Sequence, residues 1–403
     1  MVITTPQNGI FQHRVAYILD QQLPAQKANT EQVMNTISSL ASEGVNIKLF
    51  IPRKWRTLGR SKKQFKQKLL DYYDIQNGFT VSGIFHLPFS PFKIDKISHG
   101  ILAAFYSMAA KHEIVYTRNS LPALIALVLG KKVVFEVYRI YKQEKRDSVI
   151  QYLAQRTQSS NSLVIITHSL PSKESLLQIG AAEKKVEVIP NGFNPDLFTS
   201  ELTKTEARRQ LGWNARDKIA CYTGRIDLDK GLEFILDLAG KTPEINYILI
   251  GDSQKDTNDW ILTVAGEKGL RNIKWSPRVT MRELPKYLFA SDVLIIPPTA
   301  GPLMRYGETV LPIKTFIYLA AGRCILAPAL PDTAGVLNDQ NAVLVQPDNL
   351  DSAAKAIRKI FEDEGWVSSI AKQAQLDSKN YTWQSRAKRI IEFVNDQFLD
   401  SKQ

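Results

Sequence analysis

The chain has 403 residues, of which 44% are hydrophobic and 23% charged, and its formal net charge is +12. This composition is typical of a soluble globular protein, and the length exceeds one ordinary hydrophobic core, so two domains are expected. No apolar run approaches the ~20 residues needed to span a bilayer. Residues 1–13 show no basic flank followed by an apolar core, so no secretory signal is visible. We therefore expect a cytoplasmic protein with anionic partners, and peripheral association with a membrane stays open.

The first half of the chain has the order strand, helix, strand. Residues 14–19 and 45–51 form short apolar strand patterns, and a helix pattern between them ends near Ser39. This order predicts a parallel sheet with right-handed crossovers, in which ligands bind at the carboxyl ends of the strands. The loop after the first strand contains no glycine pair, so a glycine-rich phosphate loop is not expected in this half.

Polar side chains follow two later strand patterns in the same half. Arg118 ends the strand pattern at 113–118, while Glu136 and Tyr138 end the pattern at 132–138. We expect all three side chains at the ligand edge of the sheet, facing a crevice. Each of them, taken alone, is equally well explained as a satisfied surface group.

The segment Arg53–Lys68 contains eight Lys and Arg residues and no acidic residue, and Trp55 and Phe65 are interspersed among them. One interpretation is a solvated surface helix. The other is a basic face that docks on anionic lipid or guides an anionic acceptor. Nucleic acid is not expected, because no recognised binding motif accompanies the segment.

The second half repeats the architecture without repeating the sequence. Its strand patterns lie at 218–226, 247–253, 273–275, 292–297, 324–327 and 342–345. They predict a second parallel sheet with its own ligand edge. The last segment, from Tyr381 onward, is a strongly amphipathic helix. Cys221 and Cys324 each lie in an apolar strand pattern, so we expect buried reduced thiols and no disulfide or metal site.

The stretch Arg305–Pro328 has the pattern loop, helix, strand. Pro312 suits the first position of the helix, and Gly322 suits the position just after its end. The start of such a helix offers backbone N–H groups and the positive end of its dipole, and Lys314 adds a full charge. This stretch therefore predicts a pocket for a phosphate-bearing ligand.

Several motifs, in this order and spacing, resemble those of the retaining GT-B glycosyltransferases, specifically glycosyltransferase family 4. The resemblance covers nearly the whole chain. Its pieces are Val188–Phe198 (Val-Ile-Pro-Asn-Gly-Phe-Asn-Pro-Asp-Leu-Phe), Tyr222-Thr-Gly-Arg-Ile with Lys230-Gly231, Ile250-Gly251-Asp252, Ser291–Pro297, the stretch Arg305–Pro328, Tyr381-Thr-Trp-Gln-Ser-Arg-Ala and, in the first half, the loop from Pro24 to Met34.

The resemblance implies an α/β GT-B fold, with two Rossmann-like parallel-sheet domains facing across a cleft. Residues 1–190 with 383–403 would form the acceptor-binding domain, with the last helix crossing back onto it, and residues 191–382 would bind the donor. The implied reaction transfers a hexosyl unit with retention of configuration from a UDP- or GDP-type sugar nucleotide to a glycan, a lipid or another acceptor.

The same resemblance also implies the residues of the donor site. Arg225 after Gly224 and Lys230 would clamp the diphosphate, whose charge grows as the sugar departs. Glu308 is the best candidate for the sugar hydroxyls. The remaining donor-side candidates are Asn191, Gly192, Pro312, Ile313, Lys314 and Thr315, and those on the acceptor side are Lys27, Asn29, Arg118, Glu136 and Tyr138.

Two positions depart from the pattern of the family. Ile317 stands where relatives carry a glutamate for the ribose hydroxyls, and Tyr138 stands where relatives often place a histidine. A neutral phenol donates a hydrogen bond but is no base near pH 7. No metal or other cofactor is expected: Asp227-Leu-Asp229 has the spacing of a metal motif, but we interpret both as surface carboxylates beside the cationic clamp.

These departures keep two alternatives open. The first is a binding or regulatory subunit that retains the fold without catalysis. The second is a sugar-nucleotide 2-epimerase, which needs ionisable groups around the sugar ring, and we rank it last because the sequence offers few histidines.

Overall fold

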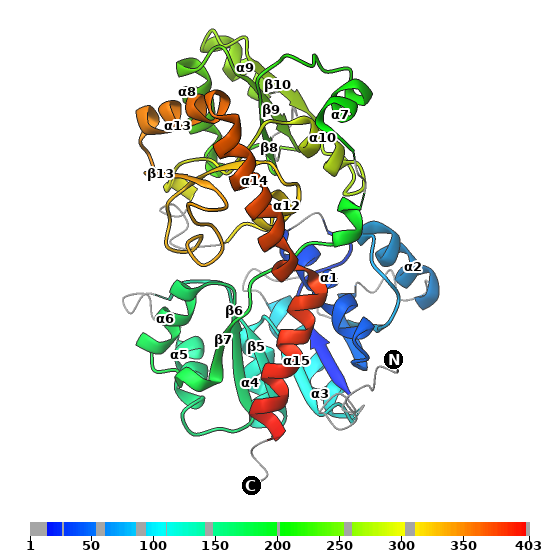
Figure 1. Cartoon of the computed structure of the whole chain (residues 1–403). Helices are drawn as coiled ribbons and strands as arrows, with labels where there is room; N and C mark the ends of the chain where they lie inside the picture. Colours follow the sequence, from blue (N-terminus) through cyan, green and yellow to red (C-terminus); the bar gives the residue numbers. More distant parts are fainter. Residues whose placement is uncertain are drawn as a thin grey trace, which may run out of the picture. The chain divides into compact units, whose positions relative to one another are not determined.

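The computed structural model describes residues 14–25, 28–53, 61–85, 94–109, 111–141, 148–199, 202–253, 260–302 and 311–399. The chain divides into two compact units, each described by itself: unit 1 comprises Met1–Asn191 with Trp383–Gln403, and unit 2 comprises Gly192–Thr382. Both units are α/β with parallel sheets, which confirms the predicted pair of Rossmann-like domains (Figure 1). The cleft expected between them stays a prediction.

Unit 1 contains a seven-stranded parallel sheet in the order β3-β2-β1-β4-β5-β6-β7. Its strands are β1 (Val15–Ile18), β2 (Ile47–Arg53), β3 (Thr80–Phe85), β4 (Ile114–Thr117), β5 (Lys132–Glu136), β6 (Leu163–Thr167) and β7 (Val186–Val188). Its helices are α1 (Ala28–Ser42), α2 (Lys62–Tyr73), α3 (Ile94–Ala109), α4 (Ser120–Val128), α5 (Ser148–Arg156), α6 (Leu170–Gln178) and α15 (Trp383–Leu399).

The two faces of this sheet are covered by different helices. On one face α1, α2 and α15 bury apolar side chains against alternate strand residues, among them Tyr17 and Leu49. On the other face α3, α4, α5 and α6 pack on the neighbouring positions, among them Ala16 and Phe50. This is the period of two expected for a strand buried on both sides. The last helix, α15, packs beside α1 in unit 1, as the resemblance implied (Figure 1).

Unit 2 contains a six-stranded parallel sheet in the order β10-β9-β8-β11-β12-β13. Its strands are β8 (Ile219–Thr223), β9 (Asn246–Ile250), β10 (Ile273–Ser276), β11 (Val293–Ile295), β12 (Cys324–Pro328) and β13 (Val343–Val345). Its helices are α7 (Lys204–Leu211), α8 (Leu232–Lys241), α9 (Trp260–Glu267), α10 (Leu284–Ala290), α12 (Lys314–Ala320), α13 (Leu350–Glu362) and α14 (Glu364–Ser378).

Both sheets reverse their strand order between the first strand and its neighbour on the other side, β1 and β4 in unit 1 and β8 and β11 in unit 2. Such a reversal point is where ligands bind in open α/β sheets. Cys221 and Cys324 are free and buried, as predicted. Within the part of the chain that is described, no helix is both long and apolar enough to cross a membrane.

Candidate functional site

Two glycines set the shape of the loops at the carboxyl ends of β8 and β9. Gly224 has φ of +139° and Gly251 has φ of +149°, values that side chains rarely tolerate. A Cβ atom added at Gly251 would lie 1.8 Å from the carbonyl oxygen of Gly224. One added at Gly224 would lie 2.8 Å from Nζ of Lys314. Only glycines allow the two strand ends and the lysine to come this close.

Arg225, the residue after this glycine, is held by two carboxylates. Its Nε lies 2.7 Å from Asp227 Oδ2, and its Nη2 lies 2.7 Å from Asp229 Oδ2. The two aspartate side chains are only 13% and 16% exposed, so their interpretation as surface carboxylates is wrong. They hold the guanidinium in place and offset its charge.

Lys230 and Lys314 add two further cations to this loop. Lys230 Nζ lies 4.0 Å from Asp229 Oδ2, and its pKa is lowered by burial and then by Arg225. Lys314 Nζ lies over the ring of Tyr222, 3.7 Å from its centroid. Burial, and next the charge of Lys230, lower the pKa of Lys314 from 10.5 to about 7.

The surroundings of Lys314 favour an incoming anion. Among the described residues, no carboxylate forms an ion pair with its ammonium group. A phosphate placed beside Gly224 would restore the protonated form of this lysine and gain a charge-assisted hydrogen bond from it. The structure therefore brings Gly224, Arg225, Lys230 and Lys314 together at one strand end.

The turn before α12 differs in part from the prediction. The helix begins at Lys314, and Pro312 precedes it. The N–H of Thr315 donates to the carbonyl of Pro312 at 3.0 Å, and Phe316 donates to Ile313 at 3.2 Å. Since proline has no N–H, the backbone donors left for an anion are those of Ile313 and Lys314.

Ile317, where relatives carry a glutamate, is buried in the apolar core on the α12 side of the sheet. It supplies packing and no ribose ligand. The other candidate carboxylate, Glu308, lies outside the described residues, as does Lys27. Asn191 is buried in unit 1, where its Nδ2 lies 3.5 Å from His168 Nδ1. Gly192, the next residue, is buried and begins unit 2.

A second cluster surrounds Glu136 at the end of β5. This carboxylate has no exposed surface, so it cannot itself contact an acceptor, contrary to the expectation that it faces a crevice. Its Oε1 lies 3.0 Å from Nη2 of Arg386 on α15 and 2.7 Å from His168 Nε2. Gln32 donates to Oε1 at 2.7 Å, and the hydroxyl of Tyr116 donates to Oε2. Burial opposes ionisation of Glu136, but Arg386 and His168 outweigh it and hold the pKa of the carboxyl well below its usual range.

His168 was not predicted as a site residue. It directly follows β6, just as Arg118 directly follows β4, so the position after a strand could have identified it as well. Burial lowers the pKa of His168 from 6.5 to about 4, so the imidazole is neutral at pH 7. Its ring stacks on that of Tyr138, with centroids 6.3 Å apart. The site thus has a histidine beside Tyr138, supplied by the neighbouring strand.

Arg118 joins this cluster to the residues expected on the acceptor side. Its guanidinium lies over the ring of Tyr138, 4.7 Å from the centroid, and its Nη1 donates to the Asn29 carbonyl at 3.4 Å. Arg118 also donates to Gln32. The structure therefore brings together Asn29, Arg118, Glu136 and Tyr138, with Glu136 beneath the others as a buried anchor.

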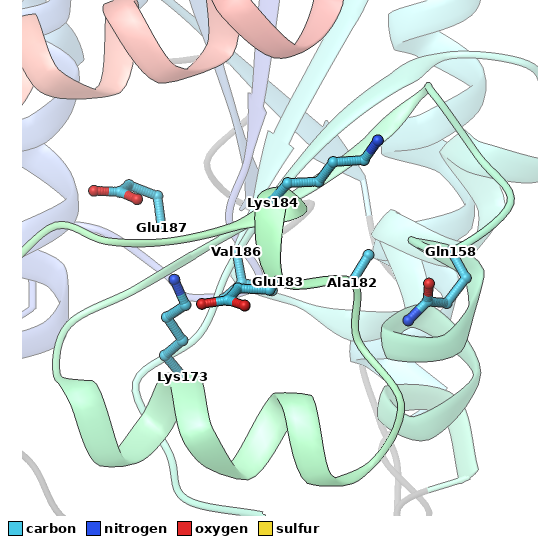
Figure 2. Close-up of a pocket in the computed structure, with 7 residues that line it drawn as sticks. All are labelled: Gln158, Lys173, Ala182, Glu183, Lys184, Val186 and Glu187. Carbon is cyan, nitrogen blue, oxygen red and sulfur yellow. The ribbon is translucent and has the colours of Figure 1, made fainter.

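A surface hollow of about 620 Å³ lies elsewhere in unit 1, between α6 and β7 (Figure 2). Its charged lining residues are Lys173, Lys184, Glu183 and Glu187. Their charges cancel, so the hollow has no preference for an anion, and we assign it no role. In the described part of the chain, no group of three His, Cys, Asp or Glu residues could hold a metal ion.

Comparison with known proteins identifies a domain in this architecture. Residues 203–383 match the family described as Glycosyl transferases group 1. The chain is 27% identical over 238 residues to an uncharacterized glycosyltransferase of Methanocaldococcus jannaschii, a match that covers 57% of this chain and 59% of the relative. It is 24% identical over 244 residues to a D-inositol 3-phosphate glycosyltransferase of Xylanimonas cellulosilytica, covering 58% of this chain and 56% of the relative. The matches therefore span less than two thirds of these relatives.

Solved structures share the fold over almost the whole chain. Anabaena HepE in complex with UDP superposes with a TM-score of 0.71 at 17% identity, covering 95% of this chain and all of HepE. Sucrose-phosphate synthase of Thermosynechococcus elongatus superposes with a TM-score of 0.75 at 18% identity, covering 96% and 100% of the two chains. The predicted GT-B fold is therefore confirmed.

Proposed function

We propose that the chain is a retaining hexosyltransferase of glycosyltransferase family 4, because residues 203–383 match the family described as Glycosyl transferases group 1. Its donor is a nucleotide-diphosphate sugar, of the UDP or GDP type. The observation that carries this proposal is the convergence of Arg225, Lys230 and Lys314 on the glycine loop after β8. Crystal structures of HepE with UDP and with UDP-glucose, on the same fold, favour a UDP-sugar.

The cations act on the leaving group. As the bond to the sugar breaks, negative charge builds up on the diphosphate, and fixed positive charges stabilise it more than the ground state. Arg225, oriented by its two aspartates, can bind two oxygens, while Lys230 and Lys314 act as point charges. Glu308 remains the candidate for the sugar hydroxyls, and no metal is required. Since Ile317 lies in the core, the ribose must be recognised by other groups.

The acceptor belongs, in this proposal, to unit 1. Arg118 and Tyr138 present a cation and a phenol beside neutral His168, a set suited to an acceptor that carries hydroxyl or anionic groups. The acceptor is a glycan or a lipid-linked saccharide, used in polysaccharide biosynthesis at the cytoplasmic face. Of the basic segment Arg53–Lys68, residues 54–60 lie outside the described part, and the rest forms the end of β2 and most of α2.

Replacement of Lys230 by alanine tests the proposal. Loss of a positive charge that acts on the leaving group should lower turnover of the cognate UDP- or GDP-sugar about 100-fold or more. The variant should unfold at the wild-type temperature in the absence of ligand, and its thermal stabilisation by UDP should shrink. Lys268→Ala, which removes an exposed lysine paired with Asp237 in the same unit, is the control and should behave as wild type. Wild-type turnover in Lys230→Ala would remove the clamp from the mechanism.

The second candidate function, a binding or regulatory subunit without catalysis, is favoured by one observation. Ile317 is packed in the core and offers no carboxylate. Such a subunit would be stabilised by UDP yet leave UDP-, GDP- and ADP-sugars intact over long incubation, whereas a transferase would release the nucleotide. A 2-epimerase would instead isomerise the free sugar nucleotide, and it remains the weakest candidate.

A further inference from the structure

Two arginine side chains lie over the ring of Tyr138 at the ligand edge of unit 1. Cζ of Arg118 lies 4.7 Å from the ring centroid, and Cζ of Arg139 lies 5.6 Å from it. Arg118 directly follows β4, while Tyr138 and Arg139 lie just after the neighbouring strand β5. The backbone of Arg139 is fixed by α6, because the hydroxyl of Ser172 donates to its carbonyl at 2.8 Å. An aromatic ring attracts a cation without neutralising its charge, so two positive charges are held close together here.

The charge of Arg118 is only partly balanced within the protein. Its side chain is 10% exposed, and its Nε lies 3.9 Å from Oε1 of Glu136. The same carboxylate oxygen is already paired with Arg386 at 3.0 Å, and the neighbouring His168 is neutral at pH 7. Among the described residues, this cluster therefore has one negative charge against two positive charges. A buried cation without a full counter-charge is costly, and an incoming anion relieves that cost.

The guanidinium of Arg118 is oriented on one side and left for a ligand on the other. Its Nη1 donates to the carbonyl of Asn29 at 3.4 Å and to the side chain of Gln32. Its Nη2 has no hydrogen-bond partner among the described residues. A guanidinium held in this way presents N–H groups in a fixed plane, which suits a ligand with several oxygen atoms.

The backbone next to Arg118 adds positive potential at the same edge. Helix α4 begins at Ser120, its N-cap Asn119 makes no capping hydrogen bond through its side chain, and its first turn contains no acidic residue. The Asn119 side chain instead accepts from the N–H of Asp20 at 3.3 Å. The start of a helix favours negative charge through its dipole and its unpaired N–H groups. It therefore supports an anion beside Arg118.

We propose that Arg118 and Arg139 bind a phosphate group of the acceptor, with Tyr138 as the surface over which both guanidiniums lie. A phosphate monoester carries up to two negative charges and three terminal oxygens, which suits two guanidiniums better than the single charge of a carboxylate does. The acceptor is then a phosphorylated saccharide or a saccharide linked through a phosphodiester. This inference rests on the proposed function for the word acceptor, but the anion site can be tested without turnover.

The experiment is titration calorimetry of the full chain with small probes, in the presence of saturating UDP so that the cations of unit 2 are occupied. Glucose 6-phosphate tests a phosphate monoester, glycerophosphoglycerol a phosphodiester, glucuronate a carboxylate and glucose the neutral sugar. We expect a phosphate probe to bind, glucuronate to bind about tenfold more weakly, and glucose not to bind. The tighter of the two phosphate probes distinguishes a phosphorylated saccharide from a phosphodiester. Failure of both phosphate probes to bind, or equal affinity for glucose and glucose 6-phosphate, would overturn the proposal.

Replacement of Arg139 tests the site directly. Arg139→Ala should weaken the tighter phosphate probe about tenfold or more, because one of two charged donors is lost. Its unfolding temperature without ligand should change little, since the side chain is exposed. Arg139→Lys keeps the charge but loses the planar fork, so its affinity should be intermediate. Arg156→Ala, which removes an exposed arginine of unit 1 that donates to Ser159, is the matched control. Wild-type affinity in Arg139→Ala would overturn the proposal.

A second variant tests Arg118 without removing the positive charge beside Glu136. Arg118→Lys should also bind the phosphate probe about tenfold more weakly, because the fork that presents Nη2 is lost. The two variants separate this inference from the proposed reaction. If they lose the probe while the wild type consumes no UDP-, GDP- or ADP-sugar, the anion site holds and the transferase fails. If the wild type turns over a donor and neither variant changes probe binding, the transferase holds and the anion site fails.

Discussion

Glu136→Ala tests the interpretation of the buried cluster as a structural anchor for the last helix. The carboxylate has no exposed surface, and it is the acidic partner of Arg386, whose side chain is 2% exposed. Removing the carboxylate leaves the guanidinium buried without a counter-charge. Among the described residues, Arg386 then keeps only its hydrogen bonds to the carbonyls of Ile189 and Pro190 and a long one to Thr36.

The cost follows from that loss. Breaking a buried ion pair by removing one partner destabilises a protein by about 3–5 kcal/mol, because the other charge stays desolvated. With a urea dependence of about 2 kcal/mol per M, the unfolding midpoint should fall by about 1.5–2.5 M. The tyrosine, histidine and glutamine that also bind the carboxylate place the expected loss toward the upper end of this range.

The chain provides a matched control for this measurement. Glu187 on β7 pairs with Arg389 on the same helix at 3.3 Å, but both side chains are about 40% exposed. Glu187→Ala should cost less than about 1 kcal/mol, because water screens and solvates both groups. Both variants remove a glutamate of unit 1 that pairs with an arginine of α15. The difference between their urea midpoints therefore reports the effect of burying the ion pair.

A midpoint for Glu136→Ala within about 0.3 M of that for Glu187→Ala would refute the anchor. The pH dependence provides an independent check. Because the folded pKa of Glu136 lies below 4.5, its contribution to stability is present above pH 4.5 and is lost as pH falls further. His168, with a folded pKa of about 4 against 6.5, has the same sign: the unfolded chain takes up the proton first, so stability falls as pH drops from 6.5 to 4.

Three predictions concern the proposed diphosphate site. Lys314→Met should raise the stability of the free chain at pH 7, because the folded state no longer buries an ammonium group, and should weaken UDP binding at pH 6. In the wild type, affinity for UDP should fall as pH rises above about 7, since the lysine must then take up a proton to bind the diphosphate; titration calorimetry with a pH-independent affinity would contradict this. Gly251→Ala should destabilise unit 2 by more than about 3 kcal/mol, through the clash with Gly224 and a φ that alanine resists. The control Gly266→Ala has open space and lies in a helix, so it should stabilise by about 1 kcal/mol; similar unfolding curves for the two would contradict the prediction.

Much of the fold was predictable because local pattern and global structure agree. Apolar runs alternate with helix patterns, and that order favours parallel sheets packed against helices. Strand β3 was not predicted, because its sequence mixes Thr80, Ser82 and Gly83 with apolar residues. It lies at the edge of the sheet and pairs only with β2 among the described strands, so it needs less apolar surface than a central strand.

The sequence by itself determined which residues end strands, and therefore that Gly224, Arg225, Arg118 and Glu136 lie at the ligand edges. Only the tertiary structure decided what those residues meet. Nothing local predicts that Arg386, 250 residues after Glu136, neutralises it, or that His168 from the next strand stacks on Tyr138. The same holds for the lowered pKa of Lys314, because desolvation depends on atoms from β8 and its loop that surround the ammonium group. Sequence spacing fixes direction along a strand, whereas burial and charge pairing depend on contacts between distant segments.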